Sequence, residues 1–165
     1  MSTGYRVLVT LHLLCIIGGF GAVAYNALYV SLAQRRPGGV GTSAVLEVNA
    51  LVSSLAELLI YAALLFGIGA VAASRSQVKF SQAWVSAAFA VYLVDVGILH
   101  GWIKPHQRRH TAIARQLEAA APAPGSPPPQ VAELQSLEKR VGFGWGAFNL
   151  LVVGAVYLMV FKPGS

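Results

Sequence analysis

The chain has 165 residues, of which 56% are hydrophobic and only 11% are charged, and its mean hydropathy is +0.63. A soluble domain carries about 25% charged residues, because its surface must face water. A chain with less than half of that fraction is expected to turn its outer surface toward lipid, which excludes an ordinary soluble domain. The net charge of +6 does not indicate nucleic acid, because the basic residues follow apolar runs as cytoplasmic loop charges do.

Four apolar runs are long enough to cross a bilayer, whose hydrocarbon core of about 30 Å requires about 20 helical residues. They cover approximately residues 7–32, 44–73, 83–102 and 141–161. Barrel strands would need only about 10 residues and would alternate in polarity. We expect the first run to be a retained helix and not a signal peptide, because it continues past the small residues at 22–24. The sequence therefore predicts an all-α membrane protein, a single domain over residues 1–165 with four transmembrane helices in an up-down bundle.

The connections between the runs predict the topology. Residues 34–39 form a proline- and glycine-containing turn, and residues 74–82 form a short link. Residues 104–140 are a polar loop with a proline-rich linker at 121–130, flanked by expected helical pieces at 110–119 and 131–140. Eight Lys and Arg residues fall on the side of this loop and four on the other side. The loop is therefore predicted to be cytoplasmic, with both termini outside the cytoplasm.

Helices in lipid associate through small and polar side chains, and each run carries a face of this kind. The first run has such residues at steps of three and four: His12, Cys15, Gly19, Ala22, Asn26 and Tyr29. The second run has a polar row at steps of four: Asn49, Ser53, Glu57 and Tyr61. The last two runs have paired glycines: Gly97 with Gly101, and Gly142 with Gly146. We expect all of these faces to lie in helix contacts, and large residues such as Leu14 and Ile17 to face lipid.

Glu57 is the strongest functional candidate among the ionisable residues of the apolar runs, which are costly in lipid. It lies about 20 Å along the second run from the cytoplasmic end, near the middle of the bilayer. Ser53 and Tyr61 are placed one turn away, where they are expected to supply hydrogen bonds. The carboxyl is predicted to be either a proton relay or cation ligand, or a neutral group that fixes helix packing.

Asp95 and His12 are the other intramembrane candidates. Asp95 has Tyr92 three residues before it, and it is predicted either to pair with Asn26 or Asn49 in packing or to share a polar path with Glu57. His12 lies on the inward face of the first run, about two turns from its outer end. It is predicted to be a haem or metal ligand, a proton relay, or a simple hydrogen-bonding residue.

The basic run that follows the third span contains His106 and His110, which have the spacing of a helical metal-ligand pair. Arg108 and Arg109 lie between them, and these cations repel a metal ion and attract anionic lipid headgroups. We therefore predict a lipid-facing basic patch of Lys104, Arg108 and Arg109, and no metal site. The sequence contains no phosphate-binding loop, nucleophile elbow or paired zinc motif, so it assigns no catalytic residue.

A family resemblance rests on two segments of the chain. Residues 9–21 read Val-Thr-Leu-His-Leu-Leu-Cys-Ile-Ile-Gly-Gly-Phe-Gly, and residues 103–109 read Ile-Lys-Pro-His-Gln-Arg-Arg. In these motifs, in length and in number of spans, the chain resembles a bacterial family of four-helix integral membrane proteins of unknown function. That family is related to the copper-resistance protein CopD and to HemJ-type protoporphyrinogen oxidases. The resemblance implies the bacterial cytoplasmic membrane as location and a haem b ligand at His12.

Three functions are consistent with these patterns. The first is a non-catalytic accessory or assembly subunit of a larger membrane complex, with the lipid bilayer, anionic headgroups and other membrane subunits as partners. The second is a haem-b-binding redox protein with His12 as ligand. The third is a small transporter or channel subunit whose path is formed by Glu57, Tyr61 and Asp95. We favour the first, because the glycine-rich helix faces occur without a set of cofactor ligands.

Overall fold

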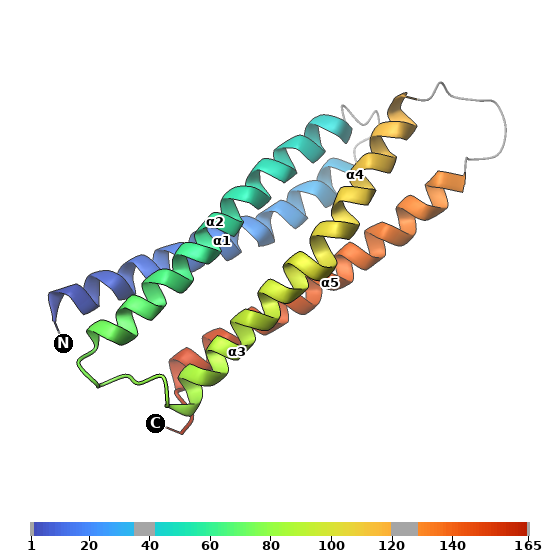
Figure 1. The fold of residues 1–165 in the computed structure, drawn as a ribbon. Coiled ribbons are helices and arrows are strands. Elements are labelled where there is room, and N and C mark those ends of the chain that lie inside the picture. The colour runs from blue at the N-terminus through green and yellow to red at the C-terminus, as the bar shows by residue number, and fades with distance from the viewer. Residues whose placement is uncertain (1, 35–41, 120–128, 165) are drawn as a thin grey trace. The chain divides into compact units, whose positions relative to one another are not determined.

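In the computed structural model, every regular element of the described residues is helical (Figure 1). The structure describes residues 2–34, 42–119 and 129–164, and it describes the backbone alone at 24, 26–34, 42–47, 50, 118 and 129. The elements are α1 (Thr3–Gln34), α2 (Thr42–Ala73), α3 (Ala83–Ile98), the π-helical segment η1 (Leu99–Ile103), α4 (Lys104–Ala119) and α5 (Pro129–Phe161). The predicted all-α class is thus confirmed for the described part of the chain.

Four helical stretches within the described residues are long and apolar enough to cross a membrane, by length and composition. They are Thr3–Val23, Leu51–Ala73, Ala83–Leu117 and Gln130–Phe161. The predicted number of membrane-length helices is therefore confirmed. The third and fourth extend well beyond the predicted limits, because polar helical residues continue both apolar runs without a break.

The chain divides into two compact helical hairpins, residues 1–79 and residues 80–165. In the first hairpin α1 packs along α2. In the second, α3, η1 and α4 follow one another as one continuous rod, and α5 packs against all three (Figure 1). The arrangement of all four membrane-length helices in one bundle stays a prediction.

The segment predicted as a polar loop is largely helical. α4 begins at Lys104 and continues through Ala119, so the basic run is part of a helix. α5 begins at Pro129, whose fixed φ and missing N–H are both compatible with the first turn of a helix. The expected helical pieces at 110–119 and 131–140 are parts of these longer helices. Arg35, Arg36 and nearly all of the linker at 121–130 lie outside the described residues.

Pro105 accounts for the π-helical turn between α3 and α4. Proline has no N–H to donate to the carbonyl four residues before it, and its ring clashes with that carbonyl in a regular α-helix. At the end of η1 the backbone N–H of Lys104 donates to the carbonyl of Leu99, five residues earlier, which widens the turn. The helix therefore continues through the proline, although the apolar pattern ends at Trp102.

Each hairpin buries its own seam. In the first, Gly19 lies against the carbonyl of Ala56 and the side chain of Ile60, both of which are almost fully buried. Leu14 and Ile17 are 60% and 68% exposed, as predicted for side chains that face away from the seam. In the second, Ile103 and Phe148 are the largest fully buried side chains among the described residues.

Candidate functional site

His12 is held in the seam between α1 and α2. Its Nδ1 lies 2.6 Å from the carbonyl oxygen of Ala63. Because a carbonyl can only accept, Nδ1 carries the proton, and Nε2 of the neutral ring keeps its lone pair. Gly67, one turn after Ala63, makes room for the ring, since a Cβ at this position would lie 3.1 Å from ring atoms. The first hairpin therefore fixes the tautomer that can bind a metal or accept a proton through Nε2.

The polar row of α2 forms pairs along its own helix. The Tyr61 hydroxyl donates to Oε1 of Glu57 at 2.9 Å, which confirms the predicted pair. Ser53 Oγ donates to Oδ1 of Asn49 at 3.2 Å. All four residues are half-buried. The carboxyl of Glu57 is therefore positioned by a donor one turn away on its own helix.

Asp95 is a buried carboxyl of the second hairpin. It is only 5% exposed, and its Oδ1 is buried without a hydrogen-bond partner among the described residues. The hydroxyl of Tyr92, one turn earlier on the same face of α3, is also buried without a hydrogen-bond partner among the described residues. The predicted partner Asn26 lies outside the described side chains, and Asn49 is bonded to Ser53. The structure thus places Glu57 with Tyr61 in one hairpin and Asp95 with Tyr92 in the other.

Trp102 joins η1 to α5 through a hydrogen bond from its ring N–H to a main-chain carbonyl, as His12 joins α1 to α2. Its Nε1 donates to the carbonyl of Arg140 at 3.1 Å. Gly144, one turn after Arg140, leaves the space, because a Cβ there would lie 2.9 Å from side-chain atoms of Trp102 and Ile103. The ring of His106 lies over Trp102, with centroids 4.9 Å apart. These contacts bring the basic end of α4 against α5.

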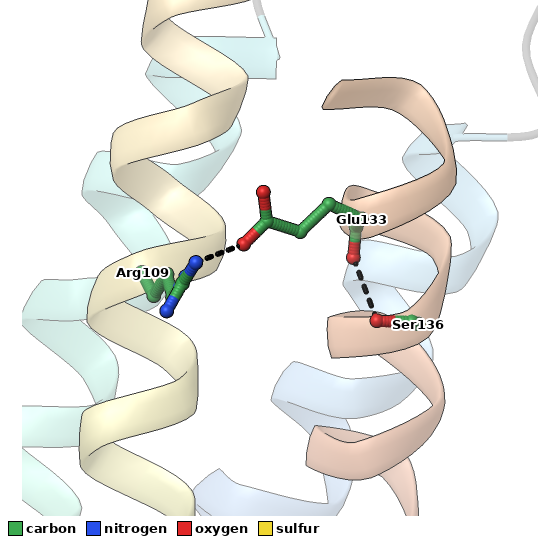
Figure 2. Close-up of polar contacts among 3 residues, drawn as sticks. All are labelled: Arg109, Glu133 and Ser136. Carbon is green, nitrogen blue, oxygen red and sulfur yellow. Dashed lines mark hydrogen bonds and ion pairs between the residues drawn. The ribbon is translucent and has the colours of Figure 1, made fainter. Parts of the chain in front are cut away.

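The three residues of the predicted basic patch do not share one environment. Arg109 forms an ion pair with Glu133 of α5 (Figure 2). The main-chain carbonyl of Glu133 accepts a hydrogen bond from Ser136 Oγ at 3.0 Å. Arg108 is exposed and Lys104 is half-buried, both on α4. Arg109 is thus used within the hairpin, and contact of the patch with lipid headgroups stays a prediction.

The paired glycines of the second hairpin lie on its outer surface. All four are exposed, and a Cβ at any of them would meet no described atom within 4 Å: Gly97, Gly101, Gly142 and Gly146. These glycines therefore take no part in the seam of their own hairpin, and the expectation that they form helix contacts stays a prediction. The buried face of the rod instead includes Val85 and Ala88 of α3 and Leu99 of η1.

The residues that hold the rings of His12 and Trp102 were not predicted from the sequence. The acceptors are main-chain carbonyls, at Ala63 and Arg140, and these have no side-chain signature. The single sequence trace is a glycine one turn after each acceptor, and glycines are common in membrane helices. Among the described residues, no group of three or more His, Cys, Asp or Glu is placed to hold a metal ion, and His12 therefore belongs to no such group.

Comparison of the chain with known proteins gives no match. No protein-family model fits it, and no curated protein and no solved structure is significantly similar to it. The functional argument therefore rests on the chain's own geometry.

Proposed function

We propose that the chain is an integral membrane protein that serves as a non-catalytic accessory or assembly subunit of a larger membrane complex. The dimensions of the second hairpin support the membrane location. Trp84 and Trp102 are 18 residues apart, about 27 Å along a helix, which is close to the hydrocarbon thickness of a bilayer. The Lys162 ammonium lies 5.5 Å from the centre of the Trp84 ring, and Lys104 follows Trp102 closely. Tryptophan beside lysine is typical of the membrane–water interface.

The observation that carries the accessory role is the difference between the glycines of the two hairpins. In the first hairpin, side chains of α2 occupy the space beside Gly18 and Gly19. In the second, the two Gly-xxx-Gly pairs are exposed and open. Such faces let another helix approach closely in lipid, where packing takes the place of the hydrophobic effect. They suit helices of other membrane subunits.

The mass of the native particle tests this proposal. We would extract the protein from its own membranes in polymer-bounded lipid discs and measure the protein mass of the particle against the 17.4 kDa of one chain. Leucine at both Gly142 and Gly146, or at both Gly97 and Gly101, is expected to release the lone chain. Gly154→Leu is the matched control, because Gly154 is also open but has leucines four residues away on both sides.

Two results would contradict the accessory role. One is a wild-type particle with the mass of a single chain. The other is a particle that contains several copies of this chain and no other protein, which would make the glycine faces a contact between identical subunits. Loss of the larger particle in the Gly154→Leu control as well would show that the effect is not specific to the paired glycines.

A second candidate function, haem b binding, is favoured by the hydrogen bond of His12. The bond from Nδ1 to the carbonyl of Ala63 leaves Nε2 as the free nitrogen, which suits an axial ligand of haem iron. Bound haem would supply one-electron chemistry, and the chain's own contribution would be the fixed orientation of the ring.

A visible absorption spectrum of the purified protein tests haem binding. A Soret band is expected that disappears in His12→Ala and persists in His100→Ala, since His100 is exposed on η1. A colourless wild-type protein with intact helical structure would remove haem binding and leave the accessory role untouched.

A further inference from the structure

Two polar groups are buried on one face of α3, where Tyr92 precedes Asp95 by three residues. Oδ1 of Asp95 can only accept a hydrogen bond when it is ionised, whereas the Tyr92 hydroxyl both donates and accepts. Neither has a hydrogen-bond partner among the described residues, and Asp95 is 95% buried. Buried polar atoms in native proteins nearly always have a partner, so an unpartnered pair indicates a bound species that completes it.

The surroundings of Asp95 on α5 are apolar. The contacts of Trp102 with Gly144 and of Trp84 with Lys162 bracket the level of Asp95 along α5. The deeply buried α5 side chains between these contacts are Phe148 and Val152. Asn149 of α5 lies near the same depth, by the rise of about 1.5 Å per residue.

The charges of the chain leave Asp95 without a cationic side chain at its own depth. No Lys or Arg occurs between residues 80 and 103, or between residues 141 and 161. The nearest cations of the hairpin lie just beyond these two segments, with Lys104 after the first and Lys162 after the second. An ionised carboxylate in such surroundings is expensive unless a positive charge neutralises it.

We propose that Asp95 and Tyr92 bind a single small monovalent cation, of the size of sodium, in the seam between α3 and α5. One positive charge neutralises one carboxylate, whereas a divalent ion would leave an excess charge in the apolar seam. Carboxylate, phenol and amide oxygens are the hard ligands that such a cation prefers. Asn149 lies near this depth on α5, and its Nδ2 donates to the carbonyl of Trp145.

A cation satisfies the carboxylate of Asp95 more completely than a water molecule or a proton does. A bridging water would give both groups a hydrogen bond but would leave the carboxylate charge uncompensated. A proton on Asp95 would remove the charge but would create a new hydroxyl donor that itself needs an acceptor. A coordinated cation neutralises the charge and contacts both oxygens at once.

Thermal unfolding in sodium chloride and in choline chloride at equal ionic strength tests the site. A ligand that binds the folded state raises the unfolding temperature, and choline is too large to enter the seam. Sodium is expected to raise the unfolding temperature of the wild-type protein in lipid discs relative to choline. Asp95→Asn is expected to abolish this difference. Tyr92→Phe keeps the carboxylate and the ring, and it is expected to raise the half-effective sodium concentration about tenfold. Tyr157→Phe, an exposed tyrosine of α5, is the matched control.

Carboxyl modification provides a second, site-resolved measurement. Dicyclohexylcarbodiimide enters apolar surroundings and modifies carboxyl groups, and mass spectrometry separates the products at Asp95 and Glu57. Sodium is expected to slow modification of Asp95 about tenfold and to leave Glu57 unaffected, since Tyr61 already engages that carboxyl.

Three results would overturn the cation site. The first is an equal unfolding temperature in sodium and choline for the wild-type protein. The second is a modification rate at Asp95 that depends on pH alone and not on sodium, which would assign a proton to the site. The third is an unchanged sodium response in Tyr92→Phe. None of these results bears on the accessory role, which depends on the outer glycine faces.

Discussion

At the scale of single residues, both hairpins use a ring N–H that donates to a main-chain carbonyl of the facing helix: His12 to Ala63, and Trp102 to Arg140. A helical carbonyl already accepts the N–H of the residue four positions later, but its oxygen has a second lone pair. A side chain on that later residue would cover the oxygen. In both hairpins that residue is a glycine, so the ring can reach the acceptor.

Gly67→Ala is expected to displace the His12 ring, because the new Cβ would lie 3.1 Å from its atoms. The hydrogen bond to Ala63 should weaken, and overpacking of this kind costs roughly 1–3 kcal/mol of unfolding free energy. Reversible unfolding in mixed micelles measures the change. Gly21→Ala is the control, since a Cβ at Gly21 meets no described atom within 4 Å. Equal stability of the two variants would show that the ring moves aside without cost.

At the scale of elements, the rod of α3, η1 and α4 is about 55 Å long, which exceeds the bilayer core of about 30 Å. Most of α4, with the beginning of α5, is therefore expected to form a stalk beyond the apolar region. Ile113, Ala114 and Leu137 are almost fully buried in this part and form its own small seam. Arg109 and Glu133 flank that seam as an ion pair (Figure 2).

The stalk is expected to depend on its apolar seam more than on its ion pair. The Arg109 and Glu133 side chains are 67% and 38% exposed, so Arg109→Met should cost less than about 1 kcal/mol. Leu137 is 5% exposed, and Leu137→Ala should cost about 2–5 kcal/mol. Amide hydrogen exchange of α4 measures both as changes in the free energy of local opening. A larger loss of protection in Arg109→Met would reverse this order.

The sequence pattern predicts the existence of the helices better than it predicts their boundaries. The apolar pattern ends at Trp102, so the third span is predicted to end there, with a helical piece at 110–119 that extends it beyond a polar stretch. In the structure the helix continues to Ala119, because η1 shifts the hydrogen bond of Lys104 to Leu99 and removes the need for a donor at Pro105. Local patterns predict that a helix exists, but the apolar pattern does not show the backbone adjustment that lets the helix pass a proline.

At the scale of the whole molecule, the loop cations predict that both termini lie outside the cytoplasm. In a Cys15→Ser background, which removes the single cysteine, Ser2→Cys should react with a membrane-impermeant thiol reagent in intact cells. Ser126→Cys, in the long connection, should react only after permeabilisation. The opposite labelling pattern would invert the topology and would leave the helical fold unaffected.

The sequence by itself determined that the described chain is helical and that four stretches are of membrane length, because both properties follow from local composition and spacing. It also determined the pair of Glu57 and Tyr61, because residues four apart on one helix face are neighbours whatever the helix packs against. Only the tertiary structure decided that His12 donates to a carbonyl of α2, that Oδ1 of Asp95 is buried without a hydrogen-bond partner among the described residues, and that the paired glycines lie outside the seam of the second hairpin. These outcomes depend on which face each helix turns to its neighbour. That orientation is set by the sum of the packing contacts along the whole seam, so no single residue determines it.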